Sequence, residues 1–255
     1  MTNEKSILVL KIGGNQVEDE AFLAGFVSTV VGLLVDHAVI VVHGGGKEIA
    51  ELHGQLGVSF ETVEGLRATS VESLRLVEMV LNGTVNTRLV RSLVNGGVDA
   101  IGLSGVDMGL VRVAPLAVNG RSLGRVGAVQ TVNGEAVLQL LDLGLVPVIS
   151  PVSLGEDGLV YNVNADHVAT GVAKAVEAVR LVFVSNVPGV QVTGRTMRAL
   201  TLQQIEGLIA DGHITGGMIP KVRSATEAVL SGVYQAVITD LMGLSNDSGT
   251  AIIKG

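Results

Sequence analysis

The chain contains no cysteine and no tryptophan, and only 2% of its 255 residues are aromatic. Without cysteine it can form no disulfide, no thiolate metal site and no cysteine nucleophile. No segment is strongly basic and the net charge is −7, which argues against a nucleic-acid surface. The start is polar, without a secretion signal, and apolar runs stop well short of the roughly 18 residues that a membrane span requires. We therefore expect a soluble cytoplasmic protein without nucleic-acid or membrane partners.

Aliphatic residues and glycine make up much of what is present. Hydrophobic residues account for 47% of the chain and charged residues for 16%, so a sizeable core is available. With few aromatics, that core must consist of Val, Leu, Ile and Ala, as in parallel strands buried on both faces. The 34 glycines gather at the ends of apolar runs. This placement indicates tight turns and close approach of the backbone to a ligand.

Short apolar runs alternate with segments of helical periodicity, which predicts an α/β fold with a parallel sheet. Strands are expected at 7–10, 38–42, 100–103, 145–149, 181–184, 236–239 and 251–253. Helices are expected at about 18–34, 47–56, 71–81, 84–95, 134–143, 166–177, 201–210 and 218–230. Asn119-Gly120 and Gly155–Gly158 indicate two inserted hairpins. If the chain forms two lobes, their boundary should lie near residues 173–180.

Lys11 and two glycine turns are the first candidates for a site. Lys11 ends a strand expected to be buried, so it either extends its ammonium group into water or carries its charge to a ligand. The turns at 13–14 and 44–46 can expose backbone N–H groups to an anion. Their spacing matches neither the P-loop nor the dinucleotide-binding motif. The run at 43–46 is similar to a hydrolase oxyanion loop, but no G-x-S-x-G nucleophile accompanies it.

Further candidates lie later in the chain. Asn162, Asn164 and Asp166 alternate before a helix, where they either cap it or converge on one site with the acid orienting lysines. Lys221 begins a helix, where a cation opposes the dipole unless an anion is bound. Arg67 is either an exposed loop residue or a bidentate partner for a substrate carboxylate. The histidines lack metal-ligand spacing and are interpreted as structural or solvent-facing: His37, His43, His53, His167 and His213.

Glycine-rich strand ends and two separated lysines together predict an enzyme that transfers a phosphoryl group. In addition, seven segments resemble the amino acid kinase family, in order and nearly from end to end. They are Lys11-Ile-Gly-Gly14, His43-Gly-Gly-Gly46, Gly65-Leu-Arg-Ala-Thr69, Gly102-Leu-Ser-Gly-Val-Asp107, Asn162-Val-Asn-Ala-Asp166, Ser185-Asn-Val-Pro-Gly189 and Gly217-Met-Ile-Pro-Lys221. The resemblance implies an open αβα sandwich with a mainly parallel central sheet and inserted β-hairpins. It also implies an acyl-substrate-binding and dimerisation lobe at 1–175 and an ATP-binding lobe at 176–255.

The chain is most similar to family members that use ATP with Mg²⁺ to phosphorylate the side-chain carboxylate of N-acetyl-L-glutamate in arginine biosynthesis. By this resemblance Asp166 would hold both lysines in place, and no residue is assigned as a metal ligand. The implied catalytic residues are Lys11, Lys221, Asp166, Gly14, Gly44 and Gly45. The implied substrate-binding residues are Arg67, Asn162, Gly45 and Gly46. The implied nucleotide-binding residues are Lys11, Gly13, Ser185, Asn186, Gly189, Met218 and Lys221.

The sequence alone leaves other functions open. Asn186 stands where members acting on acetylglutamate more often carry Asp, and kinases for carrier-protein-bound aminoadipate or glutamate can carry the same run at 185–189. The segments at 65–69 and 124–127 favour free acetylglutamate. A kinase for carbamate or aspartate and a non-catalytic regulatory module are further alternatives, and both lysines with Asp166 argue against the module. Because the first strand begins near Ile7, no N-terminal helix is expected, which predicts a homodimer without arginine feedback.

Overall fold

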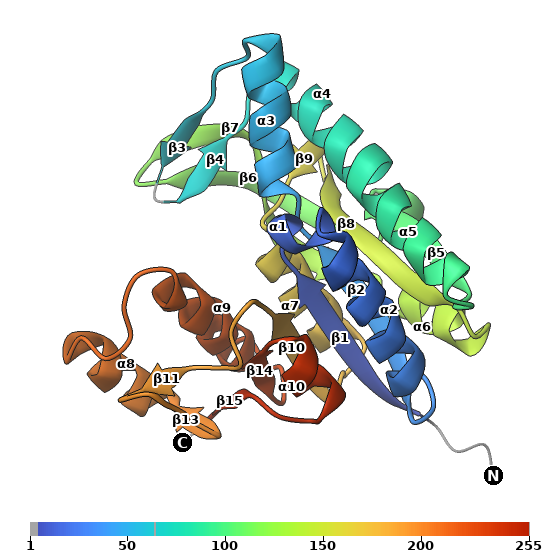
Figure 1. Cartoon of the computed structure of the whole chain (residues 1–255). Coiled ribbons are helices and arrows are strands. Elements are labelled where there is room, and N and C mark those ends of the chain that lie inside the picture. The colour runs from blue at the N-terminus through green and yellow to red at the C-terminus, as the bar shows by residue number, and fades with distance from the viewer. Residues whose placement is uncertain (1–4, 64, 255) are drawn as a thin grey trace.

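The computed structural model describes residues 5–63 and 65–254 (Figure 1). Its strands are β1 (Ser6–Ile12), β2 (His37–His43), β3 (Glu61–Val63), β4 (Leu66–Ala68), β5 (Ala100–Gly105), β6 (Val111–Val118), β7 (Arg121–Val132), β8 (Val146–Gly155), β9 (Val160–Asn162), β10 (Arg180–Val184), β11 (Gln191–Val192), β12 (Arg195–Thr196), β13 (Ala199–Thr201), β14 (Ala236–Thr239) and β15 (Thr250–Ile253). Its α-helices are α1 (Gly14–Val17), α2 (Glu20–Leu33), α3 (Gly46–Leu56), α4 (Val71–Glu78), α5 (Asn86–Asn95), α6 (Gly134–Asp142), α7 (Ala165–Ala175), α8 (Leu202–Ala210), α9 (Met218–Leu230) and α10 (Leu241–Ser245). The segments η1 (Met79–Val85) and η2 (Asp107–Gly109) are π-helical and 3₁₀-helical turns.

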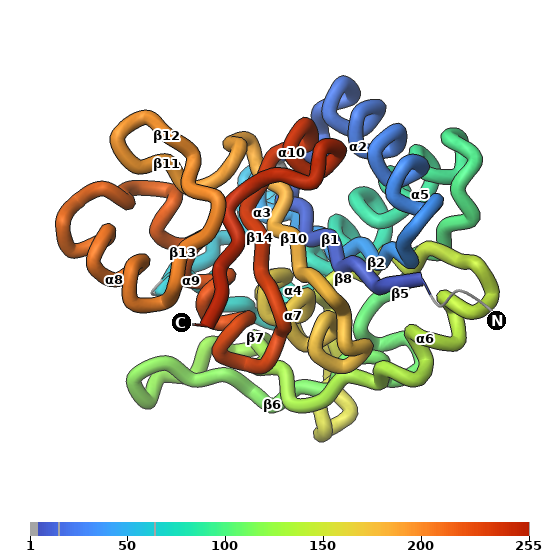
Figure 2. The backbone as a smooth tube through the Cα atoms, turned by 90° about the horizontal axis from the view of Figure 1, so that it is seen from below, coloured from blue at the N-terminus to red at the C-terminus, as the bar shows by residue number. Residues whose placement is uncertain are grey.

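One sheet runs through the described part of the chain, in the order β13-β15-β14-β10-β1-β2-β8-β6-β7-β9, with β5 also paired to β8 (Figure 2). Its centre is parallel: β1 pairs with β10 on one side and with β2 on the other. In this register Ile12 lies opposite both Val184 and His43. The carboxyl ends of three strands therefore meet at one edge, where open α/β folds bind their ligands.

Two hydrophobic cores lie on the two faces of this sheet. Because side chains alternate along a strand, Val9 enters one core while Leu8 and Leu10 enter the other. The first core is completed by apolar residues of α7 and α9, and the second by residues of α2, η1 and α5. Helices thus cover both faces, and the expected α/β sandwich with a mainly parallel sheet is confirmed.

Both expected hairpins are present. β6 and β7 pair on either side of Asn119 and Gly120, whose φ angles of 50° and 76° are the two positive values that a type I′ turn requires. β8 and β9 pair around Gly158, which also has a positive φ. Smaller strand pairs that the sequence did not indicate add the hairpins β3–β4 and β11–β12.

The two helices expected at 71–81 and 84–95 are not separated by a break. They form one helical run in which η1 joins α4 to α5. Gly83 does not end the helix, because a π-helical turn carries the chain past it. This turn brings Leu81 and Val85 against the glycine turn after β2, where both side chains contact the position of Gly45.

The connection between α7 and β10 spans residues 176–179, within the interval in which we placed the lobe boundary. The lobe assignment itself stays a prediction, since β1 and β10 pair directly across it. No helix in the described residues is long and apolar enough to cross a membrane.

Candidate active site

Lys11 lies next to the last residue of β1, and its side chain forms an ion pair with Asp166 in the first turn of α7. The distance from Lys11 Nζ to Asp166 Oδ1 is 2.8 Å, and both side chains are about one-fifth exposed. The N-cap of α7 is Asn164, whose side chain accepts the Asp166 N–H at 2.9 Å. Asp166 therefore lies in the first turn, as the capping interpretation required, and also reaches the site.

The other carboxylate oxygen of Asp166 accepts a hydrogen bond from Ser224. The Ser224 Oγ atom lies 2.7 Å from Asp166 Oδ2 and comes from helix α9. A single carboxylate thus joins β1, α7 and α9. Nothing in the segment around Ser224 singles it out, because only the fold brings it within reach of a residue 58 positions away.

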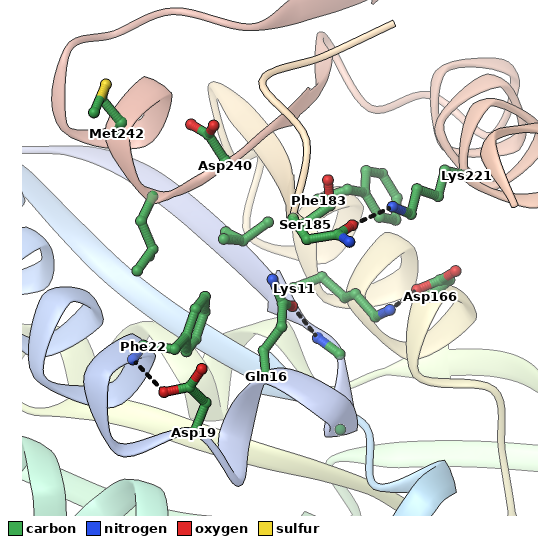
Figure 3. Close-up of a pocket in the computed structure, with 15 residues that line it drawn as sticks. Lys11, Gln16, Asp19, Phe22, Asp166, Phe183, Ser185, Lys221, Asp240 and Met242 are labelled. Carbon is green, nitrogen blue, oxygen red and sulfur yellow. Dashed lines mark hydrogen bonds and ion pairs between the residues drawn. The ribbon is translucent and has the colours of Figure 1, made fainter.

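Lys221 approaches the same place from the first turn of α9 (Figure 3). Its Nζ atom donates a 3.3 Å hydrogen bond to Asn186 Oδ1. Burial and the nearby charge of Lys11 lower the pKa of Lys221 below its ordinary value. The two lysines are therefore electrostatically coupled. Asp166 pairs with Lys11 in this structure, so the expectation that it also holds Lys221 stays a prediction.

The two glycine turns lie against each other, backbone to backbone. A Cβ atom on Gly14 would be 2.5 Å from the Cα atom of Gly45, so a side chain at position 14 cannot be accommodated without movement. A Cβ atom on Gly45 would lie 2.6 Å from Leu81. Lys47 and Glu18 form an ion pair between the segments that follow the two turns. Both turns need glycine because they are packed together.

The backbone of the second turn is held by specific partners. Gly44 N–H donates to the Ile12 carbonyl at 3.0 Å, and the Gly45 carbonyl accepts from Ile49 N–H in α3. His43 is fully buried, and its Nδ1 atom is 3.1 Å from the Gly44 carbonyl oxygen. Burial lowers the pKa of His43 to about 4. Of the two interpretations of the histidines, burial excludes the solvent-facing one for His43.

Arg67 lies in strand β4, and not in an irregular loop. Its side chain reaches the second glycine turn. Its guanidinium group lies 4.0 Å from the ring centroid of Phe60, and Nη2 donates to the Gly46 carbonyl at 3.1 Å. Nη1 is buried without a hydrogen-bond partner among the described residues. Partial burial also lowers the pKa of Arg67. An unpartnered guanidinium N–H is costly, so this side chain is suited to an anionic ligand.

Asn162 is linked to Arg67 through Thr69. The Asn162 amide donates to Thr69 Oγ1 at 3.3 Å, and Thr69 Oγ1 donates to the Arg67 carbonyl at 2.9 Å. Thr69 is also bound by backbone hydrogen bonds to Leu123 and Arg125 of β7. The two residues expected to bind the acyl substrate therefore belong to one hydrogen-bonded group.

A cleft of about 730 Å³ extends from the lysines along the edge of the sheet (Figure 3). Of the predicted site residues, its wall includes Lys11, Gly13, Gly14, Asp166, Ser185, Asn186 and Lys221. Gly189 and Met218 do not line it. Met218 packs against the first core, and Gly189, at φ 146°, lies tightly against Thr250.

The sequence pattern that defines the amino acid kinase family matches residues 6–240. The chain belongs to the amino acid kinase family. Among curated relatives, acetylglutamate kinase of Chloroflexus aurantiacus is 50% identical over 98% of both chains. Acetylglutamate kinase of Geobacillus kaustophilus is 44% identical over 91% of this chain and 88% of its own. These matches confirm the resemblance noted in the seven segments.

Solved structures agree on the amino acid kinase fold. The structure of smu.665 from Streptococcus mutans UA159 covers 100% of both chains with a TM-score of 0.84 and 31% identity. Carbamate kinase from Giardia lamblia bound to AMP-PNP covers 100% of both with a TM-score of 0.72. At 15% identity, the latter supports the fold alone.

Part of the cleft in this amino acid kinase was not anticipated from the sequence. Its far wall comprises Gln16, Asp19, Phe22, Asp240 and Met242, from α1 and from the starts of α2 and α10 with their N-caps (Figure 3). The two aspartates cap helices: Asp19 accepts from the N–H groups of Ala21 and Phe22, and Asp240 from that of Gly243. Helix-cap patterns were the available signal, but they do not distinguish a cleft-lining cap from any other.

Gln16 changes the expectation for Gly13. Gln16 Oε1 accepts the Gly13 N–H at 3.1 Å, so this donor has an internal partner in the structure. The Gln16 Nε2 atom is buried and has no hydrogen-bond partner in the described part of the chain. The amide of Gln16 thus presents a donor to the cleft at the point where Gly13 was expected to present one.

Proposed function

We propose that this protein transfers the γ-phosphoryl group of ATP to the side-chain carboxylate of N-acetyl-L-glutamate. The observation that carries the proposal is the meeting of Lys11 and Lys221, from opposite parts of the chain, beside the packed turns of Gly14 and Gly45. Membership of the amino acid kinase family and 50% identity to an acetylglutamate kinase support the same reaction.

The acyl substrate is proposed to lie between the second glycine turn and Arg67. The buried Nη1 atom of Arg67, which has no partner within residues 5–63 and 65–254, would donate to the α-carboxylate of the substrate. Asn162, held through Thr69, would bind the acetamido group. The side-chain carboxylate would then extend towards Gly44 and Gly45, next to the lysines.

A carboxylate is already a nucleophile, so the reaction requires no general base. One carboxylate oxygen forms a bond to the γ-phosphorus, the bond from that phosphorus to the β,γ-bridging oxygen breaks, and its electron pair leaves with ADP. Lys11 and Lys221 would stabilise the charge that spreads over the transferring group. Asp166 would keep Lys11 in place. The Gly14 and Gly45 N–H groups would add fixed donors, whereas the Gly44 N–H, also expected to be a donor, is already donated to the Ile12 carbonyl.

ATP is proposed to occupy the cleft of Figure 3, with its phosphates near Lys11, Lys221, Ser185 and Asn186. Among the described residues, no three His, Asp or Glu side chains are grouped so that they could hold a metal ion. This arrangement fits Mg²⁺ that is carried by the nucleotide, since Mg²⁺ is commonly bound by substrate phosphates with few protein ligands. Bound there, Mg²⁺ would neutralise phosphate charge.

We also propose that the protein works in the cytoplasm as a homodimer without feedback by arginine. The proposal rests on membership of the amino acid kinase family and on the match to an acetylglutamate kinase over nearly the whole of both chains. Sedimentation that shows a hexamer, or strong inhibition by arginine, would contradict it.

A carrier-protein-bound aminoadipate or glutamate is the second candidate substrate, and Asn186 is the observation that favours it. Asn186 contacts Lys221 directly, so its identity affects a catalytic lysine. The segments at 65–69 and 124–127 favour the free acid, because they resemble those of the enzymes that act on free acetylglutamate.

A hydroxamate assay with ATP and Mg²⁺ tests the function, because hydroxylamine traps acyl phosphates. N-Acetyl-L-glutamate, N-acetyl-L-aminoadipate and free glutamate are compared at equal concentration. We expect the strongest signal with N-acetyl-L-glutamate and none in Lys221→Met. Absence of signal with N-acetyl-L-glutamate, or a stronger signal with N-acetyl-L-aminoadipate, would reject the proposed substrate.

A further inference from the structure

His43 has no part in the chemistry described above, although it directly precedes the second glycine turn. It ends strand β2 and is fully buried, and the hydrogen bonds described for it go to neither Lys11 nor Asp166. Its two ring nitrogens have different partners: Asn86 on the Nε2 side and the Gly44 carbonyl on the Nδ1 side. These partners determine which nitrogen carries the proton.

The orientation of the Asn86 amide is fixed by its surroundings. Its Nδ2 atom lies 2.8 Å from the Val148 carbonyl and 3.4 Å from the Leu103 carbonyl. An amide oxygen in that position would face two other oxygens, so the NH₂ group must point there. The same Nδ2 atom lies 3.1 Å from His43 Nε2. His43 Nε2 must therefore be the unprotonated acceptor.

With Nε2 as an acceptor, the proton of the neutral imidazole is on Nδ1. That N–H then donates to the Gly44 carbonyl oxygen at 3.1 Å. If both nitrogens were protonated, the Nε2–H group would face the NH₂ group of Asn86, and two donors cannot form a hydrogen bond with each other. The depression of the His43 pKa by burial agrees with a ring that stays neutral. Asn86 thus sets the tautomer of His43.

A hydrogen bond to the Gly44 carbonyl fixes the direction of the next N–H group. The peptide bonds of the described residues contain no cis form, so the Gly44 carbonyl and the Gly45 N–H point in opposite directions. The Gly45 nitrogen lies against the first glycine turn, because a Cβ atom on Gly14 would be 2.8 Å from it. Within residues 5–63 and 65–254, no protein group accepts the Gly45 N–H.

We infer that His43 is a positioning residue: held by Asn86 as the Nδ1–H tautomer, it fixes the Gly44–Gly45 peptide so that the Gly45 N–H faces the reacting groups. The inference rests on the proposed function for the nature of those groups, the acceptor carboxylate and the transferring phosphoryl. Fixed backbone donors of this kind stabilise the transition state because they need no reorganisation during the reaction.

Two variants separate the halves of this arrangement. His43→Asn keeps an amide donor near the position of Nδ1 and loses the contact with Asn86. His43→Gln keeps an acceptor near Nε2 and loses the contact with Gly44. Both remove one buried hydrogen bond, so both should lower the melting temperature by a similar amount. Only His43→Gln releases the Gly44 carbonyl.

We expect His43→Gln to lower kcat about tenfold to hundredfold, while His43→Asn stays within about threefold of the wild type. The Kd of MgADP, measured by calorimetry, should change in neither variant. Equal losses of kcat in both variants, or full kcat in His43→Gln, would overturn the inference. The rates are measured with the carboxylic acid that gives the strongest hydroxamate signal.

The tautomer is tested in the wild-type protein independently of any substrate. With ¹⁵N-labelled histidine at pH 7, NMR should show a protonated Nδ1 and an unprotonated Nε2 for His43, assigned by comparison with His43→Asn. The opposite tautomer or an imidazolium would overturn the inference. If N-acetyl-L-glutamate proves not to be a substrate, the proposed function falls while this measurement still decides the tautomer.

Discussion

Ser224 and Asp166 are joined by a 2.7 Å hydrogen bond that links helix α9 to helix α7 at the carboxylate paired with Lys11. Ser224→Ala should lower kcat about tenfold, because a hydrogen bond to a charged group contributes about 1.5–3 kcal/mol. Ser224→Thr, which keeps the hydroxyl group, should recover most of the loss. Ser231→Ala, at the exposed end of the same helix, is the control and should leave steady-state kinetics unchanged.

The alkaline limit of activity should reflect Lys221. Because burial and the charge of Lys11 lower its pKa, Lys221 loses its proton at a lower pH than an ordinary lysine does. We expect kcat/KM for ATP to fall on the alkaline side as that charge disappears. Lys221→Arg should be slower but should shift the fall to higher pH, since guanidinium stays protonated. An unchanged alkaline limit in this variant would assign the limit to another group.

Protein stability should decrease in mild acid because of His43. Its pKa is about 4 in the folded protein, whereas an unfolded histidine has a pKa of about 6.5. Between these values the unfolded chain binds a proton that the folded chain does not, so the free energy of unfolding falls as the pH is lowered. The decrease from this residue between pH 7 and pH 5 is about 2 kcal/mol.

Urea unfolding of the wild type and His43→Asn at both pH values checks this decrease. Carboxylates titrate in both proteins, so the difference between the two isolates the histidine. The wild type should lose about 2 kcal/mol more than the variant. Parallel pH dependence in the two proteins would contradict the lowered pKa.

Gly14 should not tolerate even one added methyl group. In Gly14→Ala the new Cβ would be 2.5 Å from Gly45 Cα, and a backbone atom cannot move aside as a side chain can. We expect a loss of about 2 kcal/mol in the free energy of unfolding and at least about tenfold in kcat. Gly54→Ala provides the matched control: this position in α3 has open space, and the change should stabilise by about 0.5–1 kcal/mol. Denaturant unfolding and steady-state rates of both variants provide the test.

Arg67 should affect the acyl substrate more than ATP. Arg67→Lys removes the planar group whose Nη1 has no hydrogen-bond partner among the residues that the structure describes, so KM for N-acetyl-L-glutamate should rise about tenfold to hundredfold with a small change in kcat. Arg121→Lys is the control, since Arg121 is an exposed residue paired with Glu61. Steady-state kinetics with each substrate varied in turn measure the effect. A larger rise in KM for ATP than for the acid would place Arg67 at the nucleotide.

The parts of the site that could be predicted from sequence are those where one residue type is unusual in its local context. Three features conflict with ordinary local preferences: Lys11 in an apolar strand, Lys221 at a helix N-terminus, and glycines directly after two strands. The structure brings both lysines and both turns to one edge of the sheet. Local conflict was therefore an effective guide to which residues the fold brings together.

Ser224, Asn86 and Gln16 could not be predicted because each is ordinary in its own segment. Asn86 contacts His43, which is 43 positions away in the chain. Asn86 directly follows a π-helical turn, and the periodicity indicated a break between two helices there. Ser224 looks like any partly exposed helical serine until α9 packs beside α7. Their roles arise from long-range packing, which a local pattern does not contain.

The direct pairing of β1 with β10 also bears on any attempt to divide the protein into two separately produced pieces. A fragment ending at residue 175 would expose one edge of β1, with Leu8, Val9 and Leu10 on a strand that is paired only with β2. Such an apolar edge recruits other chains and promotes aggregation. The two halves of this chain are therefore suited to complementation on co-expression, in which each supplies the missing neighbour of the other, and not to use as autonomous modules.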